Sequence, residues 1–321
     1  MVDIISLFDD SNIFMLYYPD RCKWFATGGE KMKKAMVFLL MLVMLLGGCR
    51  AARPERHDGK LNVYITTYPL YDFTKKIAGD RINAVQIIPA GVEAHDYEPS
   101  PKLMTKLEKC DVFIFNGGGL EAWAERIDDS LADNGVVTVN TAGGIARDDD
   151  PHVWLSPLKA KGQAEKIYKA LVKVDPINAD YYSKNYAGLK KKFERLDNDY
   201  KHTLSQAGSR DIVTTHAAFS YLCEDYGLKQ VSISGISPDS EPSPKRMAEI
   251  IDFIKKNNIK YVFFEPLTSP KLADSIAEET GIEKMTLDPL EGLTPRQKAG
   301  GEDYFSIMEE NLSSLRRELV R

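Results

Sequence analysis

The segment Pro176–Gln206, PINADYYSKNYAGLKKKFERLDNDYKHTLSQ, separates two halves of the chain that differ from it in pattern. Its apolar residues recur at spacings of three and four, so they fall on one face of a helix: Tyr182, Tyr186, Leu189, Phe193, Leu196, Tyr200 and Leu204. About thirty residues at 1.5 Å each predict one helix of about 45 Å. Asp175 and Pro176 suit its N-cap and first turn.

A coiled-coil dimer seam is the competing interpretation of this stripe. The opposite face of the segment carries no sustained pattern of charges at the positions that flank such a seam. We therefore expect a monomer in which residues 175–208 form a rigid linking helix. Such a helix favours small tilts of the two lobes that it joins over a wide hinge closure between them.

On either side of this helix, short β-rich runs alternate with helical stretches, and this predicts parallel sheets with right-handed crossovers. The fold class is α/β, with an N-terminal lobe at 61–174 and a C-terminal lobe at 209–321. The predicted strands are Leu61–Thr67, Ala84–Pro89, Asp111–Asn116, Val136–Asn140, Asp211–Thr215, Gln230–Ser234, Tyr261–Glu265 and Lys284–Asp288. The predicted helices are 70–79, 101–109, 120–133, 158–173, 217–226, 243–257, 270–280 and 302–319.

The N-terminal region has the pattern of a targeting segment. Ala35–Leu46 holds twelve consecutive apolar residues, too few for a span of about 20 but typical of a signal-peptide core. The Leu-Gly-Gly-Cys that ends at Cys49 resembles the lipobox of bacterial lipoproteins, which implies that Cys49 is lipidated and begins the mature chain. We expect translation to start at Met32. Residues 1–31 are then a non-native extension, 32–49 the lipoprotein signal peptide and 50–60 a polar tether.

Composition excludes several classes of function. The formal net charge is −5, from 42 basic and 47 acidic residues, with no Lys/Arg block that would indicate nucleic-acid binding. The four cysteines are too scattered for a disulfide framework, and we expect Cys110 and Cys223 to be buried thiols. The sequence contains no HExxH, GxSxG or phosphate-loop motif, so we expect no enzyme. We expect the acidic run at 148–150 to be a solvated loop.

Three of the five histidines lie just beyond predicted strands: His95, His152 and His216. Ligands bind at the carboxyl edge of open α/β sheets, and neutral imidazole suits zinc and other late divalent metals. A fourth ligand would complete a tetrahedron. Asp288 and Glu291 both follow the last predicted strand, and residue chemistry alone leaves both open.

Seven stretches together resemble the metal-binding lipoproteins that serve ABC importers of zinc and manganese, with the substrate-binding subunit of the zinc importer as the nearest match. They are Gly91–Pro101, Gly117–Trp123, Asp150–Pro157, Thr215–Tyr221, Gly235–Arg246, Phe263–Pro266 and Leu287–Thr294. The resemblance implies two lobes bridged by a long helix, with metal in the interlobe cleft. It implies His95, His152 and His216 as ligands, with Glu291 as the fourth and Asp288 as its alternative.

The function that follows from this resemblance is high-affinity binding of Zn²⁺ outside the cytoplasm. The expected partners are an ABC permease and its ATPase, and the expected location is the cell envelope, through a lipid on Cys49. Histidine at position 216 is the zinc-type residue of that family. A Mn²⁺ or Fe²⁺ subunit of the same class, a metallohydrolase and a surface adhesin are the alternatives. The histidine-rich loop of many zinc-type members is absent from residues 96–151.

Overall fold

The computed structural model describes residues 13–14, 25–26, 59–147 and 150–320. The chain divides into two compact units, Met1–Arg53 and Pro54–Arg321. In the first unit, β1 (Ile13–Phe14) pairs with β2 (Phe25–Ala26) in an antiparallel arrangement. The predicted start at Met32, the signal peptide and Cys49 lie outside the described residues, as does nearly all of the tether.

No helix in the described part of the chain is both long enough and apolar enough to span a membrane.

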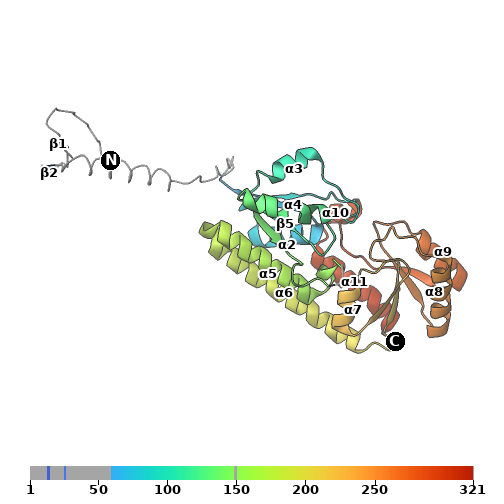
Figure 1. The fold of residues 1–321 in the computed structure, drawn as a ribbon. Coiled ribbons are helices and arrows are strands. Elements are labelled where there is room, and N and C mark those ends of the chain that lie inside the picture. Colours follow the sequence, from blue (N-terminus) through green and yellow to red (C-terminus); the bar gives the residue numbers. More distant parts are fainter. Residues whose placement is uncertain (1–12, 15–24, 27–58, 148–149, 321) are drawn as a thin grey trace. The chain divides into compact units, whose positions relative to one another are not determined.

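The first sheet of the second unit has four parallel strands in the order β4-β3-β5-β6. These strands are β3 (Leu61–Ile65), β4 (Ile82–Gln86), β5 (Val112–Phe115) and β6 (Val137–Asn140). All four residues of the central strand β5 are buried, as expected for a strand covered on both faces. The helices of this half are α2 (Tyr68–Ala78), α3 (Pro101–Leu107), α4 (Ala122–Asp133) and α5 (Pro157–Val174), and Figure 1 shows them around the sheet.

The second sheet repeats the arrangement, with four parallel strands in the order β10-β9-β7-β8. Its strands are β7 (Asp211–Thr214), β8 (Lys229–Ser232), β9 (Tyr261–Phe264) and β10 (Glu283–Thr286). Its helices are α7 (Ser220–Tyr226), α8 (Pro244–Asn257), α9 (Lys271–Thr280), α10 (Pro295–Gly300) and α11 (Tyr304–Leu319). The predicted fold class is therefore confirmed: two parallel sheets flanked by helices, with one long helix between them. The short helix α10 was not predicted.

The long helix is α6 (Ala179–Ser205), and it begins three residues later than predicted. Residues Pro176–Asn178 form a separate 3₁₀ turn, η2. The Asp175 carboxylate accepts hydrogen bonds from the Tyr182 hydroxyl at 2.6 Å and the Asn178 amide at 2.7 Å, so it caps no backbone N–H. Apart from the partly buried Tyr186, the apolar stripe is buried within this chain, where α6 packs against α2, α5 and α11. A dimer seam along the stripe is thereby excluded.

A shared core joins the two halves in addition to α6. One cluster of buried side chains runs from Val63 in the first sheet through Phe193 of α6 to Leu315 of α11. The Tyr304 hydroxyl, at the start of α11, donates to the Trp154 carbonyl at 2.7 Å. The Tyr200 hydroxyl of α6 donates to the Met308 carbonyl at 2.7 Å. The last helix therefore packs on both halves and restricts movement between them.

Candidate metal centre

The four residues that the sequence singles out come from four different strand ends. His95 lies in the loop after β4, and His152 lies in the loop after β6, next to the 3₁₀ turn η1 (Val153–Leu155). His216 follows β7 by two residues, and Glu291 follows β10. Because all the strands are parallel within their sheets, each sheet presents these side chains at its carboxyl edge.

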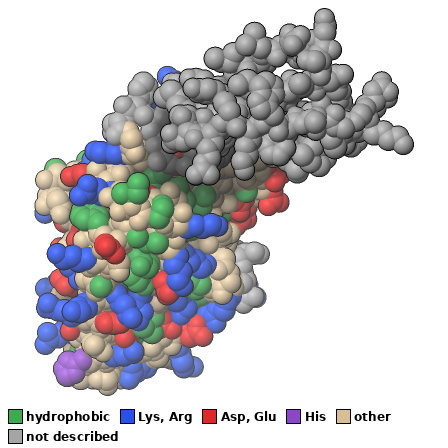
Figure 2. Space-filling view, turned by 90° about the vertical axis from the view of Figure 1, so that its left-hand side faces the viewer, with side chains coloured by type: hydrophobic (Ala, Val, Ile, Leu, Met, Phe, Trp, Pro, Cys, Tyr) green, Lys and Arg blue, Asp and Glu red, His purple; other side chains and the backbone are tan. Residues whose placement is uncertain are grey.

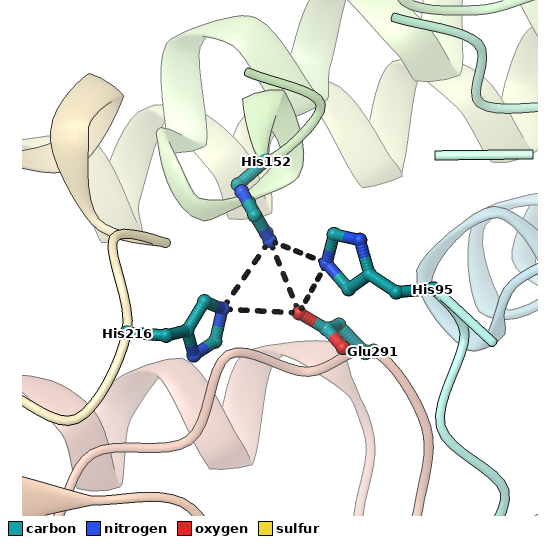
Figure 3. Close-up of side chains that lie close together, drawn as sticks. All are labelled: His95, His152, His216 and Glu291. Atoms are coloured by element: carbon teal, nitrogen blue, oxygen red, sulfur yellow. Dashed lines mark hydrogen bonds and ion pairs between the residues drawn. The ribbon is translucent and has the colours of Figure 1, made fainter. Parts of the chain in front are cut away.

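The side chains of these residues point toward one another (Figure 3). The His152 Nε2 lies 3.2 Å from the His95 Nε2 and 3.4 Å from the His216 Nε2. The Glu291 Oε1 lies 3.1 Å from the His152 Nε2 and 3.5 Å from the Nε2 of each other histidine. All four donor atoms lie within 4.8 Å of one another.

These separations are those of a tetrahedral site. Ligands at about 2.0–2.1 Å from a zinc ion stand about 3.3–3.4 Å apart at the corners of a tetrahedron. Three nitrogens and one carboxylate oxygen are also a donor set typical of zinc. The side chains of His152, His216 and Glu291 are buried, whereas 10% of the His95 side chain remains exposed. The residues present therefore fit a Zn²⁺ ion, with His95 on the solvent side.

A carboxylate orients each of the two buried imidazoles through its other ring nitrogen. The His152 Nδ1 lies 2.8 Å from the Asp150 Oδ1, and Asp150 also accepts a hydrogen bond from the Ser220 hydroxyl. The His216 Nδ1 lies 2.5 Å from the Glu265 Oε1, at the end of β9. Such contacts hold the ring and direct the Nε2 lone pair toward a metal.

These contacts also shift pKa values in the metal-free site. Burial opposes the charge on His216, but Glu265 and Glu291 outweigh it and raise the pKa of His216 to about 10. Burial likewise opposes charge on His152, and hydrogen bonds to Asp150 and Glu291 raise its pKa. Burial disfavours an ionised Glu291, yet hydrogen bonds from Glu93 and the histidines hold its pKa well below the usual value. The carboxylate of the group is thus ionised at neutral pH.

The other predicted candidate, Asp288, lies outside this group of four. Its Oδ1 accepts from the Leu290 N–H at 2.7 Å, and its Oδ2 accepts from the Gln297 side-chain amide at 2.7 Å. Leu290 has a φ of 58°, a left-handed conformation that is costly for a leucine. The Asp288 side chain supports this strained turn, and the turn directs Glu291 toward the histidines.

Sequence reasoning missed three carboxylates around the site. Asp150 is buried and bonded to His152, so the expectation of a solvated loop at this residue was wrong; Asp148 and Asp149 lie outside the described residues. Glu265 directly follows β9, which lies beside β7, and that position was a usable signal. Glu93 lies beside Glu291, and burial together with a hydrogen bond to Glu291 raises the pKa of Glu93 to about 9.

The remaining candidates lie elsewhere. Cys110 and Cys223 are buried free thiols, as predicted. His202 is exposed on α6, and His57 lies outside the described residues. Within residues 59–147 and 150–320, the group of His95, His152, His216 and Glu291 is the one cluster of three or more possible metal ligands.

Comparison with known proteins shows the family to which this chain belongs. A family model described as ZnuA, zinc-uptake complex component A, periplasmic, matches residues 63–318. This chain belongs to the ZnuA family. Its predicted resemblance to zinc-type metal-binding proteins is confirmed.

Two characterised relatives and one solved structure illustrate the similarity. The zinc-binding lipoprotein AdcA of Streptococcus pneumoniae is 40% identical over 307 residues, which cover 89% of this chain but 61% of AdcA. The high-affinity zinc uptake system protein ZnuA of Bacillus subtilis is 36% identical over 306 residues, covering 89% of this chain and 96% of that protein. The crystal structure of the Zn(II)-bound ZnuA-like domain of S. pneumoniae AdcA superposes with a TM-score of 0.75 at 42% identity, over 82% of this chain and 100% of that domain.

Proposed function

We propose that this protein is the extracytoplasmic zinc-binding subunit of an ABC importer. It binds Zn²⁺ with His95, His152, His216 and Glu291 and delivers the ion to a membrane permease driven by an ATPase subunit. The observation that supports this most directly is the convergence of three imidazole nitrogens and one carboxylate oxygen at tetrahedral spacing. The family description and the names of the two relatives, a zinc-binding lipoprotein and a zinc uptake system protein, point in the same direction.

Zinc is favoured over Mn²⁺ and Fe²⁺ by the chemistry of the donors. Manganese usually takes more oxygen ligands and a higher coordination number than this group provides. We expect the purified protein, stripped of metal and dialysed against equimolar Zn²⁺ and Mn²⁺, to retain zinc and essentially no manganese. Metal analysis by mass spectrometry measures this directly. Preferential retention of manganese would contradict the proposed cargo.

A binding role is favoured over metal-dependent hydrolysis by the number of donors. A hydrolytic zinc site keeps one coordination position for water, whereas these four donors complete a tetrahedron. The zinc-loaded protein should therefore leave phosphoester and peptide substrates intact. Zinc-dependent turnover that disappears in a His152→Ala variant would favour the metallohydrolase alternative.

Zinc binding should tighten as the pH rises. Ligands must lose their protons before they bind metal, and the pKa of His216 is raised to about 10 in the metal-free site. Below that pKa a proton competes with zinc, so affinity should fall steadily as the pH drops, by up to about tenfold per unit for each proton released. Chelator competition between about pH 6 and about pH 8 measures this slope. An affinity that stays constant across this range would contradict the histidine ligands.

Attachment to the membrane should depend on Cys49. A lipid chain contributes about 0.8 kcal/mol per buried CH₂, and the lipobox-like Leu-Gly-Gly-Cys is the one anchor signal that we find in the sequence. We expect Cys49→Ser to move the protein from the membrane fraction to the soluble fraction. Its zinc affinity should not change, because the site lies in residues 95–291. A Cys49→Ser protein that stays tightly bound to membranes would refute the lipid anchor.

A further inference from the structure

The turn between α5 and α6 exposes an unusual amount of apolar surface. Ile177, in η2, is 94% exposed, whereas the next most exposed large hydrophobic residue among the described residues is 39% exposed. Tyr181, one helical turn later, is 38% exposed. Scattered apolar residues are normal on protein surfaces, but Ile177 is almost fully exposed. Surfaces that lie at a membrane interface combine apolar and aromatic side chains with basic ones. We call Ile177 and Tyr181 the α5–α6 tip.

The α5–α6 tip lies close to the point at which the tether joins the fold. Tyr181 lies against Gly79. If Gly79 carried a side chain, its Cβ would lie 2.4 Å from the Tyr181 hydroxyl oxygen. The same ring lies 5.2 Å from the Arg81 guanidinium. Arg81 directly precedes β4, whose first residue pairs with Leu61, the first residue of β3. Leu61 is also the first residue after the predicted tether.

The length of the tether keeps this end of the protein near the bilayer. Leu61 follows Cys49 by twelve residues, which reach at most about 40 Å when fully extended. A lipid on Cys49 would therefore hold the amino-terminal end of β3, and the α5–α6 tip beside it, within this distance of the membrane. Stable attachment of lipidated proteins commonly combines the lipid with a second membrane contact.

The charges around the tip also suit an anionic lipid surface. Three exposed basic side chains lie near the tip in sequence or in space: Arg81, Lys173 and Lys184. The nearby Lys75 and Asp80 offset each other in an ion pair of 3.2 Å, and Asp180 is the exposed carboxylate next to Tyr181. Figure 2 views the molecule from the side on which the adjoining ends of α5 and α6 lie, and on this face Lys and Arg side chains are interspersed with hydrophobic and acidic ones. Basic residues near an anionic surface strengthen attachment to it.

We propose that the α5–α6 tip rests on the lipid bilayer, with Ile177 and Tyr181 at the boundary between headgroups and acyl chains. This inference rests on the proposed lipid anchor at Cys49. His95 and His152 follow the carboxyl ends of β4 and β6, whereas the tip lies at the amino-terminal end of the same sheet. A protein resting on its tip therefore turns the metal site away from the membrane, toward the source of zinc. Delivery to the permease then requires the protein to rotate on its tether until the metal site faces the membrane.

The orientation can be measured with a fluorophore at the tip. We would prepare the lipidated, zinc-loaded protein as Ile177→Cys, label it with an environment-sensitive thiol probe and reconstitute it in phosphatidylethanolamine–phosphatidylglycerol vesicles that carry nitroxide lipids. Cys110 and Cys223 are buried, Cys22 precedes the expected start at Met32, and Cys49 carries the proposed lipid, so the label is confined to the new thiol. The matched control is Leu158→Cys, which is 38% exposed at the other end of α5.

We expect nitroxide lipids to quench the probe at position 177 several-fold more than the probe at position 158. Quenching at 177 should also increase with the fraction of phosphatidylglycerol. Equal quenching at the two positions, in a protein that binds zinc and stays on the vesicles, would overturn the tip contact and leave the proposed function standing. A protein that fails to bind zinc or to attach to vesicles contradicts the proposed function, and a detached protein also contradicts the tip contact.

Discussion

Replacing Glu291 with glutamine is expected to weaken zinc binding by about 10²–10³-fold, or about 3–4 kcal/mol at 1.4 kcal/mol per factor of ten. Glutamine keeps the shape of the side chain but removes its negative charge. The Glu291 Oε1 lies within 3.5 Å of three imidazole nitrogens, and Glu291 is the one carboxylate among the four possible ligands. Its negative charge would offset part of the charge on Zn²⁺, and the substitution removes that contribution. Competition with a calibrated zinc chelator measures the change.

Asp288→Asn is the matched control for this experiment. It makes the same chemical change three residues away, in a carboxylate whose two oxygens already accept hydrogen bonds from Leu290 and Gln297. We expect a much smaller loss of zinc affinity, because Asp288 acts on the turn and not on the ion. If Asp288→Asn costs more affinity than Glu291→Gln, the assignment of the fourth ligand is wrong. Two silent variants would mean that water or another group completes the site.

The second large effect is expected from His216→Glu. A hard carboxylate oxygen in place of an imidazole nitrogen should weaken Zn²⁺ binding and improve the relative affinity for Mn²⁺. The loss should be large, because the substitution removes a nitrogen donor that suits zinc and leaves Glu265 without the imidazole that it contacts. Zinc and manganese titrations of the same preparation give the ratio of the two affinities.

His202→Gln serves as the control, since this histidine is exposed on α6 and lies outside the group of four possible ligands. It should bind both metals as the unchanged protein does. Unchanged zinc affinity in His216→Glu would remove His216 from the ligand set. To separate ligand loss from unfolding, the thermal midpoint of each metal-free variant should be compared with that of the unchanged protein.

Much of the fold followed from periodicity alone. The eight strands of the two sheets were predicted to within three residues at each end, because short β-rich runs bounded by turn residues are typical of strands. The stripe on α6 was recognised from its 3.6-residue period. The start of α6 was placed too early because the sequence does not distinguish a 3₁₀ turn at Pro176–Asn178 from the first turn of an α-helix.

The site was only partly predictable from the residues themselves. Each histidine follows a strand, so the parallel topology brought His95, His152 and His216 to the carboxyl edges of the sheets. The choice between Asp288 and Glu291 depended on the direction of two side chains in a strained turn, which residue types do not specify. Asp150 remained hidden for a similar reason, because a carboxylate near a ligand is indistinguishable from a solvated one until its burial is known, whereas Glu265 could have been found from its place after a strand.

The position of α11 has a consequence for the order in which the protein is made. Phe73, in the first half of the chain, stacks edge-on against Tyr304 with ring centroids 4.8 Å apart. The core of the first half therefore lacks one wall until α11 (Tyr304–Leu319) has been synthesised. A nascent chain cannot complete this core before α11 emerges from the ribosome, more than two hundred residues after Phe73. Late completion of the core keeps the chain unfolded for longer, and this would suit the extracytoplasmic location that we propose.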